Sequence, residues 1–587
     1  MKRLTFLLMI SVTVVTTGCL EEKFPSQVQT SDQLGSSPDA LQFLANGMYS
    51  YLHVDNCGGG ADEVAWGYGA RMMSHSMMGP DVTLGSSSLN YAGRPFGDLL
   101  YLGNWGYQST DWYYYYRQIF TSNQVLQAVN VDDPELATAL KEVAGQALIL
   151  RAWMYLDMAV TYEYKKTGYD ALDQKATDNG IMGLTVPIVS ERTSEAESFS
   201  NPRAPYYAMY RFILTDLNKA ENFLSTYTRA DKATPDLSVV YGVQARFWLE
   251  LATRFRLYPN DLTEMLSHDS DEALAYYDVL GVSTVQECYA KASDYARKAI
   301  SYGGYSPLTS AQWHNATTGF NDASTSDAWM MAIVITEDAA PYYYYYSWVA
   351  QNSVEFNYSL YAPGFGNSET GYIRINKELY DQIPETDWRK TTWLDPADVG
   401  SAPGSKYVTL LSDDAFKKVI AYTGFKFRPG QGDMSNDKTG NAVDIPMMRV
   451  EEMYLIEAEA EAFANGLSAG VTLLNNFVST YRNPAYSYTA ADERDFLREI
   501  LLQKRIEFWS EGNPGSLDFK RLEFRVERGY PGTNWLVSQR YNSSEKAGTV
   551  APWMNLYITD NETTRNTAVI PNPDPSSVVS TECKWTE

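Results

Sequence analysis

Apolar residues recur at helical spacing in two neighbouring stretches in the first third of the chain, residues 110–126 and 140–162. Apolar positions three and four residues apart lie on one face of a helix, so each stretch predicts an amphipathic helix. Asp133-Pro134 offers an N-cap and a first-turn proline for the second helix. We therefore expect two antiparallel helices joined by a short turn.

The same helical periodicity returns further along the chain, in residues 206–224, 237–257, 285–302, 450–464, 469–481 and 493–509. Pro235-Asp236 stands at the start of the second of these stretches. Helices that come in pairs, with Ala and Tyr at packing positions, are typical of tetratricopeptide-like stacking. We expect at least three such helix pairs, which are not contiguous in the sequence.

Two intervening stretches, residues 54–109 and 303–445, are rich in Gly, Ser, Asn, Trp and Tyr and show no helical period. Within the second, residues 328–336 (AWMMAIVIT) have the composition of a buried strand. Long loops inside a compact protein usually carry function. The sequence therefore predicts a mainly α fold: a tetratricopeptide-like helix-pair scaffold with an irregular, aromatic-rich loop region and minor β-strands.

The first residues have the features of an export signal. Lys2-Arg3 precedes an apolar run of about a dozen residues, which is shorter than the roughly 20 that a membrane-spanning helix needs. Thr16-Thr17-Gly18-Cys19 resembles a bacterial lipobox, with Thr16 where Leu is usual. We expect residues 1–18 to be a signal peptide, Cys19 to be lipidated and residues 19–37 to form a flexible tether. An ordinary signal peptide with an incidental cysteine is the alternative.

Composition excludes several classes of function. The formal charge is −25, so a basic groove for nucleic acid is not expected. The four cysteines form no CxxC pair, and the sequence contains no HExxH, GxSxG or GxxxxGK[ST] motif. No metal, cofactor or catalytic residue is therefore predicted. Because 72 carboxylates make close pairs inevitable, a glycosidase-type pair stays open as an alternative.

Four segments together resemble the SusD/RagB family of nutrient-binding outer-membrane lipoproteins. Residues 111–123 are similar to its W-x-x-Y-Y…I…N helix, and residues 145–155 (GQALILRAWMY) to its G-E-A-x-x-L-R-A-x-x-Y signature, with Gln146 in place of Glu. Residues 445–460 resemble its R-x-A-E-x-Y-L-x-x-A-E-A helix, and residues 504–521 its E-R-x-x-E-L…E-G…D-L-x-R ending, with Lys504 in place of Glu. The resemblance covers residues 19–587.

Five charged residues of these motifs lie on otherwise apolar helices: Arg151, Glu457, Arg505, Glu507 and Asp518. Such charges are tolerated inside a protein only when they are paired, so we expect buried ion pairs and caps that join helices. We assign residues 38–587 to one SusD-like domain. Its helical scaffold spans residues 38–302 and 445–525, and its inserted ligand-binding region spans residues 303–444.

The loops place aromatic side chains beside amides and a guanidinium. Sugar rings have apolar faces and polar rims, which suit flat aromatic surfaces flanked by hydrogen-bonding groups. The resemblance implies that the ligand site lies in the loop before the Trp112 helix and in loops of the inserted region. We therefore predict that some of the following residues converge on a ligand, although each aromatic among them could instead be a packing residue: Arg94, Asn104, Trp105, Tyr107, Trp313, Tyr344, Tyr346 and Trp348.

The resemblance implies a lipid-anchored outer-membrane protein that faces the cell surface and is not an enzyme. Its function would be to capture an oligosaccharide or polysaccharide for import through a SusC-like TonB-dependent β-barrel transporter, its expected partner. Three alternatives stay open: a peptide or glycoprotein-fragment binder of RagB type, an anchored glycan-cleaving enzyme, and a helical scaffold that binds only proteins.

Overall fold

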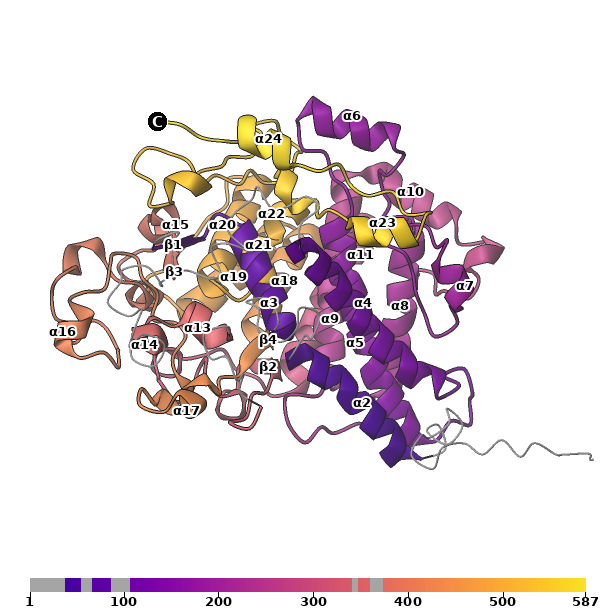
Figure 1. Ribbon diagram of the computed structural model, residues 1–587, viewed down its shortest axis with the longest axis horizontal. Helices are drawn as coiled ribbons and strands as arrows, with labels where there is room; N and C mark the ends of the chain where they lie inside the picture. Colours follow the sequence, from indigo (N-terminus) through magenta and orange to yellow (C-terminus); the bar gives the residue numbers. More distant parts are fainter. Residues whose placement is uncertain (1–36, 54–65, 86–105, 340–346, 359–372) are drawn as a thin grey trace, which may run out of the picture.

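The computed structural model describes residues 37–53, 66–85, 106–339, 347–358 and 373–587, and within them the protein is mainly helical (Figure 1). Its long helices are α2 (Pro38–His53), α3 (Gly67–Met78), α4 (Gly106–Gln127), α5 (Thr138–Tyr162), α8 (Tyr206–Phe223), α9 (Leu237–Leu257), α11 (Val285–Tyr302), α18 (Val450–Ala464), α19 (Leu467–Tyr481) and α20 (Glu493–Glu507). None of the described helices is both long and apolar enough to span a bilayer.

Shorter elements connect these helices. The short α-helices are α6 (Asp170–Asp178), α7 (Glu195–Ser198), α10 (Pro259–Ser267), α12 (Ser310–Trp313), α13 (Trp348–Asn352), α14 (Val354–Phe356), α15 (Lys377–Gln382), α16 (Asp413–Phe416), α17 (Asp437–Asn441), α21 (Asn513–Ser516), α22 (Asp518–Arg521), α23 (Asp560–Arg565) and α24 (Ser576–Thr581). The 3₁₀ turns are η4 (Glu272–Leu274), η5 (Ala323–Thr325), η8 (Trp388–Thr392), η9 (Pro396–Asp398), η10 (Gly430–Gly432), η11 (Val537–Gln539) and η12 (Pro552–Met554).

The long helices pack one against the next. Contacts run from α4 to α5, then to α8, α9, α11, α18 and α19, which confirms the predicted scaffold of tetratricopeptide-like pairs. α11 and α18 form a pair although residues 303–449 separate them in the sequence. In Figure 1, α13 to α16 from this intervening stretch lie on the opposite side of the molecule from α4, α5 and α8.

Helix starts show where the sequence signals succeeded and where one failed. Asp236 caps α9 as predicted, and its side chain accepts hydrogen bonds from the backbone N–H groups of Ser238 and Val239 at 3.0 and 3.3 Å. The prediction that Asp133-Pro134 opens the next helix was wrong. α5 begins at Thr138 with no side-chain cap, and Asp133 instead accepts from the Glu135 N–H at 2.9 Å, which closes a turn.

The interpretation of residues 54–109 as irregular was also wrong in part. α3 lies within this range and is buried along its whole length, where it contacts α2, α4 and α21. A helix that is buried on every side carries no polar stripe, so its sequence shows no amphipathic period. The Gly, Ser and Met residues of α3 therefore resembled a loop.

Two small antiparallel sheets tie distant segments together. β2 (Trp329–Ile333) pairs with β4 (Ile445–Arg449), which confirms the predicted buried strand. β1 (Val82–Leu84) pairs with β3 (Ile373–Ile375). The β2–β4 sheet lies against α9 at a close approach, because a Cβ at Gly242 would be only 2.3 Å from the sulfur of Met448.

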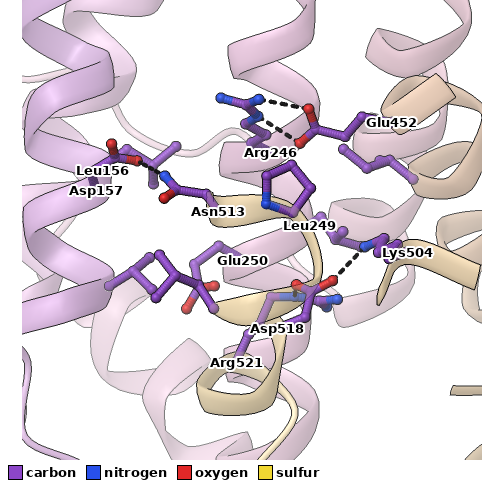
Figure 2. A pocket seen from close by; sticks show the side chains of 14 residues that line it. Leu156, Asp157, Arg246, Leu249, Glu250, Glu452, Lys504, Asn513, Asp518 and Arg521 are labelled. Carbon is purple, nitrogen blue, oxygen red and sulfur yellow. Dashed lines mark hydrogen bonds and ion pairs between the residues drawn. The ribbon is translucent and has the colours of Figure 1, made fainter. Parts of the chain in front are cut away.

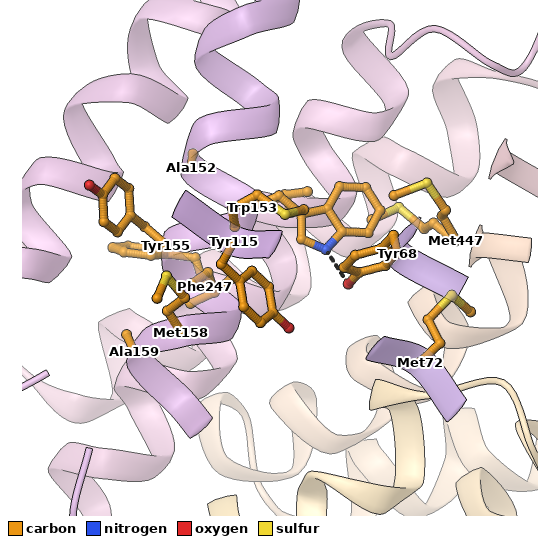
Figure 3. Close-up of a cluster of buried hydrophobic side chains, with 14 of the residues drawn as sticks. Tyr68, Met72, Tyr115, Ala152, Trp153, Tyr155, Met158, Ala159, Phe247 and Met447 are labelled. Atoms are coloured by element: carbon orange, nitrogen blue, oxygen red, sulfur yellow. Dashed lines mark hydrogen bonds between the residues drawn. The ribbon is translucent and has the colours of Figure 1, made fainter. Parts of the chain in front are cut away.

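The core is centred where α3, α4, α5 and α9 meet β4, and it is rich in aromatic side chains (Figure 3). Trp153 donates through its indole N–H to the Tyr68 hydroxyl at 3.1 Å. That hydroxyl donates in turn to the Asp157 carboxylate at 2.5 Å. The polar ends of Trp153 and Tyr68 are thus satisfied inside the core.

Candidate functional site

Most of the residues predicted to contact a ligand cannot be placed. Arg94, Asn104, Trp105, Tyr344 and Tyr346 lie outside the described residues. Tyr107 falls in the first turn of α4, where the backbone alone is described. Their convergence stays a prediction.

Trp313 and Trp348 are described, and both belong to the core. Each is 1% exposed. Trp313 donates to the Thr392 hydroxyl at 3.0 Å and meets Phe320 edge-on with ring centroids 4.8 Å apart. A ring enclosed in this way offers no free face to a sugar. The prediction that Trp313 and Trp348 contact a ligand is therefore wrong: both are packing residues of the core.

Residues that flank the undescribed stretches lie close to one another. Leu84, just before residues 86–105, is the register partner of Ile373, just after residues 359–372. Trp66, which follows residues 54–65, meets Trp348, which follows residues 340–346, with ring centroids 5.8 Å apart. The residues that flank 86–105 and 359–372 are therefore neighbours in the structure, and so are the residues that flank 54–65 and 340–346.

A buried ion cluster holds the region around Trp313 to the helical scaffold. Its centre is Glu507 at the end of α20, whose carboxylate contacts Arg389 at 3.0 Å, Arg449 at 3.2 Å and Arg482 at 2.7 Å. Arg389 comes from η8 in the intervening stretch, whereas Arg449 ends β4 and Arg482 follows α19. We name these four residues the Glu507 cluster. It joins the intervening stretch to three scaffold elements.

The charges at this joint are balanced. Besides Glu507, the carboxylates are Asp387 on Arg389, Glu451 on Arg449 and Arg482, and Glu511 on Arg449 and Lys426. Four cations thus face four carboxylates. Lys426, Arg449 and Arg482 also lie within 6 Å of the Trp313 ring centre, so the indole covers the cluster by cation–π contact.

The pKa values follow from burial and neighbours. Burial alone would raise the pKa of Glu507, but the guanidinium groups of Arg482 and Arg449 outweigh it and hold the pKa well below its usual range. Burial lowers the pKa of Lys426 to about 8, against the opposing attraction of Glu511. Glu507 was predictable from the sequence, but Arg389 and Arg482 were not, because both lie outside the stretches with a helical period.

The other family motifs are joined in the same way. Arg151 on α5 contacts Asp216 on α8 at 2.7 Å and donates to the side-chain oxygen of Asn123 on α4 at 2.7 Å. Arg521 contacts Glu459 on α18 at 2.6 Å and Asp518 at 2.7 Å. The predicted structural pairing of Arg151, Glu507 and Asp518 is confirmed. Arg505 is also paired, with Asp81 at 2.7 Å, whereas the partner of Glu457 is the half-exposed Arg297.

A polar cavity of about 80 Å³ lies between α5, α9, α18 and α21 (Figure 2). Arg246–Glu452 and Lys504–Asp518 form ion pairs in its wall, at 2.6 and 2.7 Å. Burial raises the pKa of Asp157 to about 6 and also raises the pKa of Glu250. Ligand pockets for small molecules measure about 300–1,000 Å³, so this cavity is too small for a sugar ring. Asp157 and Glu250 therefore do not form a glycosidase-type pair around a substrate in this cavity.

In the described part of the chain, no group of three or more His, Cys, Asp or Glu side chains is placed so that it could hold a metal ion.

Two family models match the chain. A model described as "Starch-binding associating with outer membrane" matches residues 97–249, and the SusD family model matches residues 308–574. No curated protein matches the sequence. The two models lie on either side of α11 and together contain the Arg151 contacts and the Glu507 cluster.

Solved structures share the fold along nearly the whole chain. A SusD-like carbohydrate-binding protein from Bacteroides vulgatus is 22% identical, with 91% of this chain and 97% of that one covered and a TM-score of 0.64. A SusD superfamily protein from Bacteroides thetaiotaomicron is 16% identical, with 92% and 100% covered and a TM-score of 0.60. Surface glycan-binding protein A from the same organism, in complex with laminarihexaose, is 16% identical, with 91% and 99% covered and a TM-score of 0.59. The chain belongs to the SusD family of glycan-binding, outer-membrane-associated proteins.

Proposed function

We propose that this protein captures an oligosaccharide or polysaccharide at the cell surface and does not cleave it. The observation that carries the proposal is the match to the SusD family models over residues 97–249 and 308–574. The solved structure of a surface glycan-binding protein in complex with laminarihexaose, which shares this fold, supports a carbohydrate as the ligand class.

The ligand site of this proposal comprises the loop before α4 and residues 340–346. It includes Arg94, Asn104, Trp105, Tyr107, Tyr344 and Tyr346. The meeting of Leu84 with Ile373 brings together the residues that flank 86–105 and 359–372, and the contact of Trp66 with Trp348 does the same for 54–65 and 340–346. Both contacts support a site built from loops, because chain segments that start from neighbouring points can reach one another. Glu507 and the charged groups around it fix the intervening stretch to the scaffold, and a pre-formed support lowers the entropy cost of binding.

Affinity electrophoresis through gels that contain a panel of neutral and acidic polysaccharides tests the capture step. The wild-type protein is expected to be retarded by at least one polysaccharide, and Trp105→Ala is expected to weaken the retardation. Phe43→Ala is the matched control, because Phe43 is 78% exposed on α2. Retardation by no polysaccharide would contradict the proposal, and release of shorter fragments would indicate an enzyme instead. Binding of peptides alone would indicate the RagB-type alternative.

We further propose that a lipid anchor at Cys19 holds the protein to the outer membrane, where it delivers the glycan to a SusC-like TonB-dependent transporter. A protein without a membrane-spanning helix among its described residues needs a separate pore to move a large nutrient. Mild-detergent purification of the tagged protein from its native membrane is expected to recover a β-barrel partner. Cys19→Ala is expected to release the protein from the membrane. Recovery of the wild-type protein alone, with every glycan tested, would remove the support for this partner.

A further inference from the structure

A groove of about 760 Å³ lies at one end of the helical scaffold, far larger than the cavity in Figure 2. Its walls come from the residues after α5, the start of α8, the end of α9 and α10, which is labelled at the upper right of Figure 1. We name it the α8–α10 groove. It continues into a second groove of about 620 Å³, and the two share Leu257, Glu523 and Gly548. Its size is that of a small-molecule site, and the continuation suits an extended ligand.

Lys165 is the first sign that the α8–α10 groove is built for a ligand. It lines the groove and is only 6% exposed. Its backbone is fixed by Asn555, whose side chain accepts from the Lys165 N–H at 3.1 Å and donates to its carbonyl at 2.8 Å. Its ammonium group has no hydrogen bond or ion pair with any described residue. The carboxylates of Glu163 and Glu250 attract this ammonium group without a direct hydrogen bond, so its N–H donors stay available to a ligand.

Two of the neighbouring acids, Glu163 and Asp261, are already paired with Arg254. Glu163 holds Arg254 through both carboxylate oxygens, at 2.6 and 2.7 Å, and the same guanidinium contacts Asp261 at 2.8 Å. Lys165 makes no hydrogen bond to either acid, so it remains a donor that a ligand in the groove can use.

Tyrosine side chains supply the flat surfaces. Tyr206 carries the Arg254 guanidinium 3.7 Å from its ring centre and donates to the Glu264 carboxylate at 2.8 Å. Tyr207 stacks on His268 with ring centroids 3.8 Å apart and stays partly exposed. Tyr258, also partly exposed, donates to Glu523. Each ring is held in place by a polar or aromatic neighbour before any ligand arrives, which favours binding.

The charges of the lining identify the ligand class. The cations Lys165, Lys166 and Arg254 face four acids, which are Glu163, Asp261, Glu264 and Glu523. A near-balanced lining does not attract a polyanion, whereas carboxylate acceptors beside an ammonium donor match hydroxyl groups, which both donate and accept. Partly exposed tyrosine rings next to these groups match the apolar faces of sugar rings.

We propose that the α8–α10 groove is a second saccharide-binding site, separate from the loops before α4, that holds a segment of a neutral oligosaccharide. The inference rests on the proposed function, because it assumes that the protein meets glycans. Lys165 donates to a sugar hydroxyl at the base, Tyr207 and Tyr258 provide ring surfaces, and Glu264 and Glu523 accept from hydroxyls at the rim. A chain that lies in both connected grooves would be held along several sugar units.

Isothermal titration calorimetry with single hexasaccharides tests the second site: laminarihexaose, maltohexaose, xylohexaose and mannohexaose. The wild-type protein is expected to bind at least one of them at two sites. Lys165→Met and Tyr207→Ala are each expected to weaken the affinity of the α8–α10 groove for the hexasaccharide by roughly tenfold, because each removes a main contact. Trp105→Ala is expected to leave the groove event unchanged. Tyr302→Ala is the matched control, since Tyr302 is an exposed tyrosine on α11 outside the groove.

Lys165→Met also separates a binding role from a structural one. Methionine keeps most of the buried stem but removes the charge that Glu163 and Glu250 attract, so the variant is expected to keep the folded circular dichroism spectrum while binding weakens. A variant that loses the folded spectrum together with binding would indicate a structural lysine and overturn the assignment. Binding at a single site that Trp105→Ala abolishes and the groove variants leave intact would overturn this inference alone. Binding of none of the four hexasaccharides, nor of any polysaccharide in the gels, would overturn the proposed function as well.

Discussion

Glu507 is a carboxylate without exposed surface that contacts three guanidinium groups. The desolvation of such a cluster offsets much of its Coulomb attraction, so the intact cluster contributes little net stability. Removal of a single member has a much larger effect, because the remaining charges stay buried without compensation. Charge balance, rather than the number of ion pairs, is therefore what keeps this part of the core stable.

Glu507→Ala is expected to lower the free energy of unfolding by about 3–5 kcal/mol, since it leaves three buried arginines short of a partner. Urea unfolding followed by circular dichroism measures the change. Asp414→Asn is the control: Asp414 is 93% exposed and pairs with the half-exposed Lys417, so its loss is expected to cost less than about 0.5 kcal/mol. Equal effects of the two substitutions would show that burial does not set the strength of the cluster.

His75 on α3 makes the free energy of unfolding depend on pH. Burial, with the nearby positive charges of Arg71 and Lys520, lowers its pKa to about 4 against an opposing hydrogen bond to Asn513. Between pH 6.5 and about 4 the unfolded chain binds a proton at this position and the folded protein does not. Stability therefore falls as the pH falls through this window.

His75→Asn is expected to remove that part of the pH dependence while keeping a side chain that can hydrogen-bond to Asn513. The difference in the free energy of unfolding between wild type and variant is expected to change by about 3 kcal/mol between pH 7 and pH 4. Urea titrations at a series of pH values measure it. The difference removes the contribution of Asp157 and Asp444, whose pKa values burial raises to about 6 and which act in the opposite direction. A constant difference would contradict the assignment.

At the scale of elements, helix starts in this protein differ in how they are capped. Asp236 satisfies two N–H groups at the start of α9, whereas Ala137 at the start of α5 has no side chain that could do so. The first N–H groups of a helix have no partner within the helix, so a capping oxygen stabilises that end. The start of α9 is therefore already capped, whereas a capping side chain could stabilise the start of α5.

Asp236→Ala is expected to lower the free energy of unfolding by about 1–2 kcal/mol, since it also removes the ion pair with Arg229. Ala137→Asp is the reciprocal change and is expected to raise it by about 0.5–1 kcal/mol. Chemical denaturation of the two single variants measures both. Opposite signs are the expected result, and a stabilised Asp236→Ala would show that the cap is not formed.

α9, α11 and α18 began and ended at the predicted residues. α11 has an exposed face opposite its buried one, whereas α9 and α18 are buried on almost every side and were predictable from their length and their helix-forming residues. α3 is also buried on all sides, but it is short and contains Gly and Ser residues that favour loops, so the sequence did not reveal it. At the candidate site, the sequence does not distinguish an exposed aromatic side chain from a buried one. Trp313 therefore resembled a binding residue although it covers charges inside the core.

At the scale of the whole molecule, the intervening stretch and the helical scaffold share their interior. The β2–β4 sheet and the Glu507 cluster both cross between them, and one continuous hydrophobic cluster includes residues of both. Two regions joined by a common core unfold together, because neither retains a complete core without the other.

Urea unfolding is therefore expected to show one transition, with the same midpoint by tryptophan fluorescence and by far-ultraviolet circular dichroism. Trp393 in the intervening stretch meets Trp509 in the scaffold with ring centroids 5.6 Å apart, so its fluorescence reports on their separation. Trp585→Phe is the control, because Trp585 lies near the C-terminus outside this contact. An early fluorescence transition without loss of helix would show that the two regions unfold separately.

The pairing of α3 with the last part of the chain has a consequence for how the protein is made. The carbonyls of Met78 and Pro80 accept hydrogen bonds from the indoles of Trp553 and Trp535, and His75 contacts Asn513. A ribosome adds residues from the N-terminus, so α3 has to wait for 438 to 475 further residues before these partners exist. Contacts this distant in sequence slow folding. An incomplete chain leaves this surface of α3 uncovered, so we expect the nascent polypeptide to need protection from aggregation until its final segment has been synthesised.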